Sequence, residues 1–211
     1  MRTSAAFVLI LTGCAGPVAQ NATNTSAQKI GGPCDGCELL YEGQPAPETL
    51  GSVLDLSSAN EPGEKLVIDG ILVQVDGRTP AENVILYVYH TDANGQYSPG
   101  QGQSHGARHG HLRGWLRTGP NGQFTLKTIR PAPYPDGTLP AHIHIFVKEP
   151  DKNEYYIDEV RFLDDPKLTE EERNNAEQRG GDLNIPLEKD SSGKWRGDLL
   201  ITLGKNIPDY R

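Results

Sequence analysis

Branched and aromatic residues recur along the chain in short runs where apolar and polar positions alternate. Stretches rich in Gly, Pro, Asn and Asp separate these runs. Alternation predicts β-strands, and the separating residues predict turns. We therefore predict an all-β fold, a β-sandwich of about six to seven or more strands. The strongest predicted strands are residues 65–75, 83–90, 123–129, 141–147, 154–163 and 195–203.

Two local signals refine this pattern. Thr169, followed three residues later by Glu172, forms a capping box, which predicts one short peripheral helix that ends before Gly180. Gly70 interrupts the run over residues 65–75, and an isolated glycine in a strand predicts a β-bulge.

The first fourteen residues differ from the rest. Arg2 precedes an apolar run over residues 5–11 that is too short to span a bilayer. Residues 11–14 read Leu-Thr-Gly-Cys, which resembles the bacterial lipobox, in which the cysteine is lipidated after cleavage before it. We expect residues 1–14 to be a lipoprotein signal and Cys14 to anchor an exported protein to a membrane surface. An ordinary secretory signal would instead give a secreted protein.

Residues 15–63 lack strong periodicity, and residues 15–32 are small and polar. We expect a flexible tether there, ahead of a globular domain over residues 64–211. Cys34 and Cys37 lie within it as Cys-x-x-Cys. Such a pair can be a redox site or half a zinc site, but export favours a small structural disulfide. A redox role stays open.

The net charge does not alter the predicted fold, but it bears on the choice of partner. A net charge of −8 over 211 residues argues against nucleic acid as a partner. We take the negative charge as an aid to solubility.

Candidate chemistry gathers in the strand predicted over residues 141–147. His142 and His144 share one face of that strand, and Ile143 and Ile145 share the other. Two imidazoles so placed can reach one metal ion, although a polar strand face is the alternative. Tyr97 and Tyr134 would add phenolates, which need a strong Lewis acid such as ferric iron.

A cationic loop over residues 98–110 is a second candidate region. It carries His105, Arg108 and His109. A functional loop and a solvated surface loop are equally compatible with this sequence.

The ordered motifs of the chain resemble those of the intradiol ring-cleavage dioxygenases, the family of protocatechuate and catechol dioxygenases. The resemblance covers about residues 67–165. It rests on Asp92-x-x-Gly95-x-Tyr97, Arg113-Gly114, Thr118-x-x-x-Gly122-x-Phe124, Thr128-Ile129-x-Pro131-x-x-Tyr134 and Pro140-Ala141-His142-Ile143-His144.

This resemblance implies a β-sandwich that holds Fe(III) through Tyr97, Tyr134, His142 and His144. It further implies an enzyme that uses O₂ to open a small aromatic diol between its two hydroxyl-bearing carbons. Tyr134 would leave the metal when the diol binds and would then serve as a local base.

The sequence departs from the family at two positions. Leu139 stands where ring-cleaving members typically carry an arginine, and Glu159 stands where glutamine is usual. We expect Arg113 or Arg130 to supply the missing positive charge, with Arg108 and Arg161 as further candidates. The alternative function is an iron-binding module at the cell surface whose catalysis is lost or altered.

Overall fold

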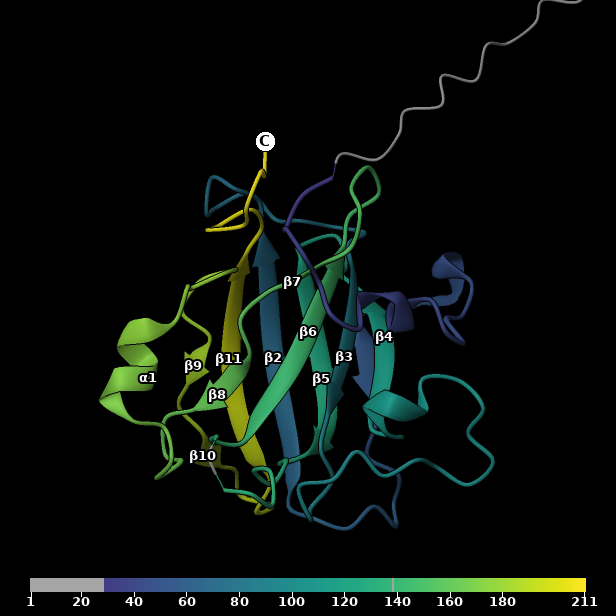
Figure 1. Cartoon of the computed structure of the whole chain (residues 1–211), viewed down its shortest axis with the longest axis vertical. Helices are drawn as coiled ribbons and strands as arrows, with labels where there is room; N and C mark the ends of the chain where they lie inside the picture. The colour runs from purple at the N-terminus through teal and green to yellow at the C-terminus, as the bar shows by residue number, and fades with distance from the viewer. Residues whose placement is uncertain (1–28, 138) are drawn as a thin grey trace, which may run out of the picture.

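A computed structural model of the chain describes residues 29–137 and 139–211 and folds into two β-sheets (Figure 1). This confirms the predicted all-β sandwich. The strands are β1 (Val53–Asp55), β2 (Lys65–Val73), β3 (Ile85–His90), β4 (Arg113–Arg117), β5 (Gln123–Ile129), β6 (His142–Lys148), β7 (Tyr155–Tyr156), β8 (Val160–Phe162), β9 (Asn184–Ile185), β10 (Glu188–Lys189) and β11 (Trp195–Thr202).

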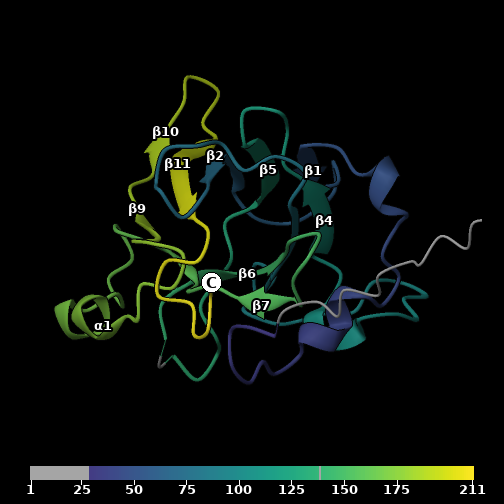
Figure 2. The same cartoon turned by 90° about the horizontal axis from the view of Figure 1, so that it is seen from above.

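The two sheets form separate layers with the core between them (Figure 2). The first sheet has the order β1-β5-β2-β11-β10. The second has the order β4-β3-β6-β8-β9, and β7 also pairs with β6. Because side chains alternate along a strand, Ile143 and Ile145 of β6 face the core. His142 and His144 therefore lie on the outer face of the second sheet, as their spacing predicts.

The short helix is confirmed as α1 (Glu170–Asn175). Thr169 caps it: its hydroxyl accepts a hydrogen bond from the backbone N–H of Glu172, and the Glu172 carboxylate accepts one from the backbone N–H of Thr169. The expected bulge at Gly70 is wrong, since β2 pairs continuously with both neighbours. A Cβ on Gly70 would lie 2.1 Å from the ring of Phe124, so glycine makes room for that ring.

The segment expected as a single strand over residues 154–163 is divided into β7 and β8. Three residues separate Tyr156 from Val160, whereas two separate their partners on β6, Phe146 and Ile143. The extra residue is a bulge, which lets both short strands pair with β6 in different registers. Glu159 lies in this bulge, next to β8.

We call residues 30–50 the N-terminal cover, because Cys34, Cys37 and Leu40 within them pack with aromatic residues on the outer face of the second sheet. This differs from the expected flexible tether. Leu40, in the 3₁₀-helix Cys37–Leu40, has no exposed surface and belongs to one buried cluster with Tyr87 and Phe146. A second 3₁₀-helix (Pro47–Thr49) and β1 continue the chain. The apolar side chains of the cover explain the packing, because they remove the large aromatic rings of β3 from water.

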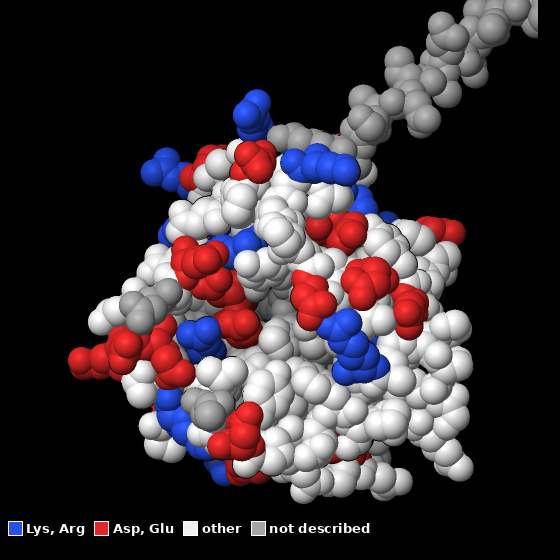
Figure 3. All heavy atoms as spheres, in the orientation of Figure 1, with Lys and Arg blue, Asp and Glu red and all other residues white. Residues whose placement is uncertain are grey.

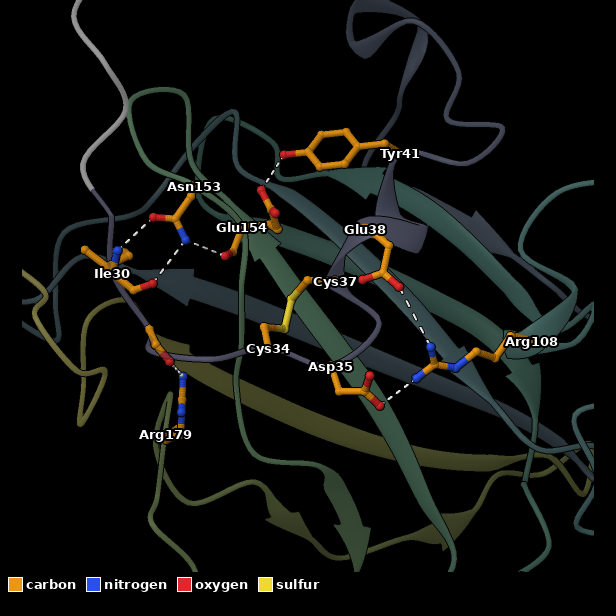
Figure 4. Close-up of a disulfide and its surroundings, with 11 residues drawn as sticks. Ile30, Cys34, Asp35, Cys37, Glu38, Tyr41, Arg108, Asn153, Glu154 and Arg179 are labelled. Carbon is orange, nitrogen blue, oxygen red and sulfur yellow. Dashed lines mark hydrogen bonds and ion pairs between the residues drawn. A yellow bond between two sulfur atoms is a disulfide. The ribbon is translucent and has the colours of Figure 1, made fainter.

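The cover is also held by polar contacts (Figure 4). Cys34 and Cys37 form a disulfide. Arg108 donates to Asp35 at 2.6 Å and lies 3.8 Å from Glu38. Residues 1–14 and the predicted lipidation site Cys14 lie outside the described residues. Within the described residues, no helix is long and apolar enough to cross a membrane.

Candidate metal centre

Four side chains converge on the outer face of β6. Tyr97 Oη lies 2.8 Å from Tyr134 Oη, and Tyr134 Oη lies 3.2 Å from His142 Nε2. His142 Nε2 lies 3.1 Å from His144 Nε2, which in turn lies 3.1 Å from Tyr97 Oη. The four donor atoms form a closed ring, and the structure thereby brings together all four predicted ligands. We call these residues the tetrad.

The spacing of the tetrad atoms fits a metal ion. Metal–nitrogen bonds of about 2.0–2.1 Å place adjacent ligands about 3 Å apart when they are separated by about 90°. The separations of 2.8–3.2 Å around the ring agree with that value. Two phenols and two imidazoles are also a donor set suited to ferric iron, since ionised phenols are hard, anionic oxygen ligands.

Contacts within the site orient the two histidines. The Nδ1–H of His142 donates to the carbonyl of Pro140 at 2.8 Å, which leaves Nε2 with a free lone pair. The His144 ring stacks on Tyr89 with centroids 4.5 Å apart. Burial lowers the pKa of His144 to about 3, and the adjacent His142 adds to that effect. The His144 imidazole is therefore uncharged at neutral pH.

The loop before Tyr97 sets the position of its phenol. The Asp92 carboxylate accepts hydrogen bonds from the backbone N–H groups of Asn94 and Gln96, which closes a tight turn. Gly95 has a φ of +76° in that turn, and a Cβ there would lie 2.1 Å from the carbonyl oxygen of Pro133. The absence of a side chain at residue 95 thus lets the Tyr97 turn pack directly against the loop that carries Tyr134.

Burial and the neighbouring phenol of Tyr134 raise the pKa of Tyr97 far above its ordinary value. A phenol in that environment stays protonated unless a strong positive charge lies beside it. Ionised Tyr97 therefore requires a cation at the centre of the tetrad.

A cavity of about 120 Å³ opens beside the tetrad. It lies between β6, β8 and α1, and it presents both apolar and charged groups. Its lining residues are Tyr134, Leu139, Pro140, His142, His144, Glu159, Arg161 and Glu172.

Glu159 and Arg161 form an ion pair at this cavity, with Arg161 Nη2 2.9 Å from Glu159 Oε2. Arg161 is the cross-strand partner of His142. Burial acts to raise the pKa of Glu159, but interactions with neighbouring groups, the Arg161 guanidinium among them, hold the pKa below its usual range. Sequence reasoning had noted both residues without placing them together.

The structure does not bring Arg113 or Arg130 to this cavity, which corrects their expected role beside the metal. Arg113 lies beneath the N-terminal cover, where it donates to the carbonyls of Leu39 and Glu42. Arg130 makes two hydrogen bonds to Asp164, at 2.7 and 2.9 Å. Both guanidinium groups are occupied by structural partners. Arg108 likewise pairs with Asp35 of the cover.

The loop over residues 98–110 divides into two parts. His105 is exposed, whereas His109 is buried and stacks on Tyr89 with centroids 3.6 Å apart. His109 Nδ1 also lies 2.9 Å from Tyr87 Oη. Tyr89 therefore lies between His109 and the tetrad residue His144. The sequence analysis missed this stack, although the alternation of Tyr87 and Tyr89 against Leu86 and Val88 was a usable signal.

The tetrad differs from metal sites built of carboxylates and thiolates. Among the described residues, no group of three or more His, Cys, Asp or Glu side chains is placed to hold a metal ion. The tetrad supplies two residues of that kind, and its other two donors are phenols.

Comparison with known proteins agrees with this geometry. The family model described as dioxygenase matches residues 40–180. An intradiol ring-cleavage dioxygenase of Aspergillus niger is 28% identical over 132 residues, which are 54% of this chain. The chain belongs to the intradiol ring-cleavage dioxygenase family. Its match begins at residue 40, within the N-terminal cover.

Other relatives of the family were found by sequence. The chlorocatechol 1,2-dioxygenase of Cupriavidus pinatubonensis is 35% identical over 101 residues, or 40% of this chain. The aligned part spans 40% of the Aspergillus protein and 38% of the Cupriavidus enzyme. The chain thus covers well under half the length of these curated relatives.

Solved structures of the family share the fold. The dioxygenase domain of a dioxygenase–carbohydrate-binding fusion from Streptomyces sp. SirexAA-E has a TM-score of 0.55 at 22% identity, covering 85% of this chain and 97% of that one. The 3-chlorocatechol 1,2-dioxygenase of Rhodococcus opacus 1CP has a TM-score of 0.56 at 25% identity, covering 77% and 66%. Both agree with the two-sheet architecture.

Proposed function

We propose that the protein is an iron(III) dioxygenase that cleaves the ring of a catechol-type diol between its two hydroxyl-bearing carbons and incorporates both atoms of O₂. The tetrad carries this proposal, because its two phenols and two imidazoles converge with the spacing of metal ligands. Membership of the intradiol family supports the reaction type.

Ferric iron held by the tetrad would supply Lewis-acid chemistry that binds the diol and activates it towards O₂. The protein holds the donors in place. Pro140 fixes the tautomer of His142, and the Asp92 turn fixes Tyr97. Tyr134 lines the cavity, and in its ionised form its Oη would take a proton from an incoming diol hydroxyl.

The visible spectrum tests the proposal most directly. Iron-loaded protein is expected to be coloured by charge transfer from tyrosinate to iron, and catechol should shift the band. Tyr97→Phe or His142→Ala should abolish the colour, whereas His109→Ala should not, because His109 lies behind Tyr89. A protein that stays colourless and iron-free after loading would contradict the metal site.

The second candidate function is an iron-binding module with lost or altered catalysis. Leu139 favours it, since this uncharged side chain lines the cavity where family members typically place an arginine. Oxygen uptake over a panel of catechols distinguishes the two functions. Coloured protein that consumes no oxygen with any catechol would favour the module.

We further propose that the protein is exported and anchored through Cys14. The disulfide between Cys34 and Cys37 supports export, because such bonds persist mainly outside the cytoplasm. Cys14→Ser is expected to move the expressed protein from the membrane fraction to the soluble fraction. Unchanged membrane association would contradict lipidation at Cys14.

A further inference from the structure

The Glu159–Arg161 ion pair lines the cavity beside the tetrad. Arg161 faces His142 across the β6–β8 pair, and Glu159 lies in the bulge beside β8. Directly paired residues of neighbouring strands have Cβ atoms about 4.5–5.5 Å apart. A ring bound at the tetrad would therefore meet both members of this pair.

The charges around the cavity are unequal. Among the described residues that line it, two are carboxylates, Glu159 and Glu172, and one is a guanidinium, Arg161. Arg161 is already neutralised by Glu159 at 2.9 Å. Glu172 accepts a hydrogen bond from the backbone N–H of Thr169 at 2.9 Å, so the capping box holds this cavity-lining carboxylate in place.

The cavity is also small and partly apolar. About 120 Å³ leaves space for little more than one aromatic ring, and Leu139 and Pro140 form one wall. A charged ring substituent would lose water in this space, and an unpaired buried charge is strongly disfavoured. A ring carboxylate would also lie within the field of two protein carboxylates.

We propose that the Glu159–Arg161 pair makes the site select aromatic diols without a charged ring substituent over diols that carry a ring carboxylate. Ion pairing with Glu159 makes Arg161 less available to a substrate carboxylate, and Glu159 adds a negative charge that repels it. This inference rests on the proposed function, and it assigns Glu159 and Arg161 as residues that determine substrate specificity.

Binding of two probes to the iron-loaded full chain tests the inference. Catechol and 3,4-dihydroxybenzoate differ by one ring carboxylate, and each dissociation constant is read from the change in the visible band. Catechol is expected to bind at least about tenfold more tightly, since one uncompensated charge contact near a protein surface has an effect of that size or larger.

Substitutions at the pair should change the ratio of the two dissociation constants, that of 3,4-dihydroxybenzoate over that of catechol, in opposite directions. Glu159→Gln frees Arg161, so 3,4-dihydroxybenzoate should bind more tightly and the ratio should narrow. Arg161→Gln leaves Glu159 uncompensated, so the ratio should widen. Glu82→Gln and Arg78→Gln make the same charge changes at exposed residues outside the cavity and should leave the ratio as in the unmodified protein.

Two results would overturn the inference while the proposed function stands. One is equal or tighter binding of 3,4-dihydroxybenzoate by the unmodified protein. The other is a ratio that moves in neither pair variant, or moves equally in the matched controls. If catechol itself causes no spectral change in iron-loaded protein, the proposed function fails, and the inference fails with it.

Discussion

The outer face of the second sheet has two halves with different surroundings. Towards β8, His142 and His144 face a cavity and two ligand loops. Towards β4, Tyr87 and Trp115 lie beneath the N-terminal cover, where the Trp115 indole N–H donates to the carbonyl of Leu40. We call these the ligand half and the covered half.

The contrast shows how one face of a sheet can serve two purposes. In the ligand half, polar donor atoms converge beside a cavity. In the covered half, aromatic rings of similar size are sealed by the disulfide-linked cover and by Arg113, whose guanidinium lies 4.8 Å from the Trp115 ring centre. Tyr89 joins the halves, since it stacks on both His109 and His144. The covered half therefore supports the tetrad residue His144.

The largest expected effect is on iron affinity, which should depend on side chains of the ligand half and much less on those of the covered half. His142→Ala removes a tetrad donor, so iron affinity should fall by more than about 100-fold, beyond the 10–100-fold typical of losing an outer partner. Tyr87→Phe deletes a hydroxyl that lies 2.9 Å from His109 and should leave bound iron close to that of the unmodified protein. Iron content after dialysis against a chelator measures both. If both variants lost iron to the same extent, the two halves would not differ in their importance for metal binding.

The next effect concerns stability in the covered half. Leu40 is fully buried against Tyr87 and Phe146, so Leu40→Ala should lower the free energy of unfolding by about 2–5 kcal/mol. Leu200→Ala removes the same atoms from a side chain that is 56% exposed and should change the free energy of unfolding by less than about 0.5 kcal/mol. Urea denaturation of both variants provides the comparison. A small effect at Leu40 would mean that the cover contributes little to the fold.

The ligand half could be predicted from the sequence. Strand alternation placed His142 and His144 on one face, and ordered motifs around Tyr97 and Tyr134 identified the other two donors. The tight turn before Tyr97 is also local, because the Asp92 side chain bonds to residues two and four positions ahead. Such short-range geometry is encoded by neighbouring residues, so a single sequence reveals it.

The covered half could not be predicted in the same way. The cover has little regular structure, and Leu40 reaches Phe146 only through the tertiary fold. The partners of Arg113 could not be predicted for a similar reason. They are the backbone carbonyls of Leu39 and Glu42, and every residue has such a carbonyl, whatever its side chain. Hydrogen bonds of this kind depend on the path of a loop. The sequence therefore indicated a catalytic arginine where the fold has a structural one.

A third effect tests β3, the strand that carries Tyr87 and Tyr89. His90 of β3 faces inward, with Nδ1–H donating to the carbonyl of Thr91 and Nε2 2.6 Å from Thr128 Oγ1. Burial lowers the pKa of His90 to about 4. Above pH 6.5 both folded and unfolded states are neutral at this residue. Below that pH the unfolded chain binds a proton that the folded chain excludes.

The free energy of unfolding should therefore fall as the pH drops from about 6.5 to about 4, and His90 should contribute about 3 kcal/mol to that fall. Urea denaturation at a series of pH values gives the slope. His90→Gln should flatten that slope relative to His105→Gln, which changes an exposed histidine. Identical slopes in the two variants would show that the buried imidazole does not control acid unfolding.

The smallest expected effect concerns the disulfide that closes the cover. The bond between Cys34 and Cys37 encloses a short loop, so reducing it should lower the free energy of unfolding by about 2 kcal/mol, less than the loss at Leu40. Bound iron should be retained, because the tetrad residues lie outside the cover and the Leu40 contacts and the Arg108–Asp35 pair do not involve the sulfur atoms. Denaturation and iron content before and after treatment with a reductant measure both. Release of iron on reduction would show that iron binding in the ligand half depends on this bond in the cover. It would also favour a redox role for the Cys-x-x-Cys segment.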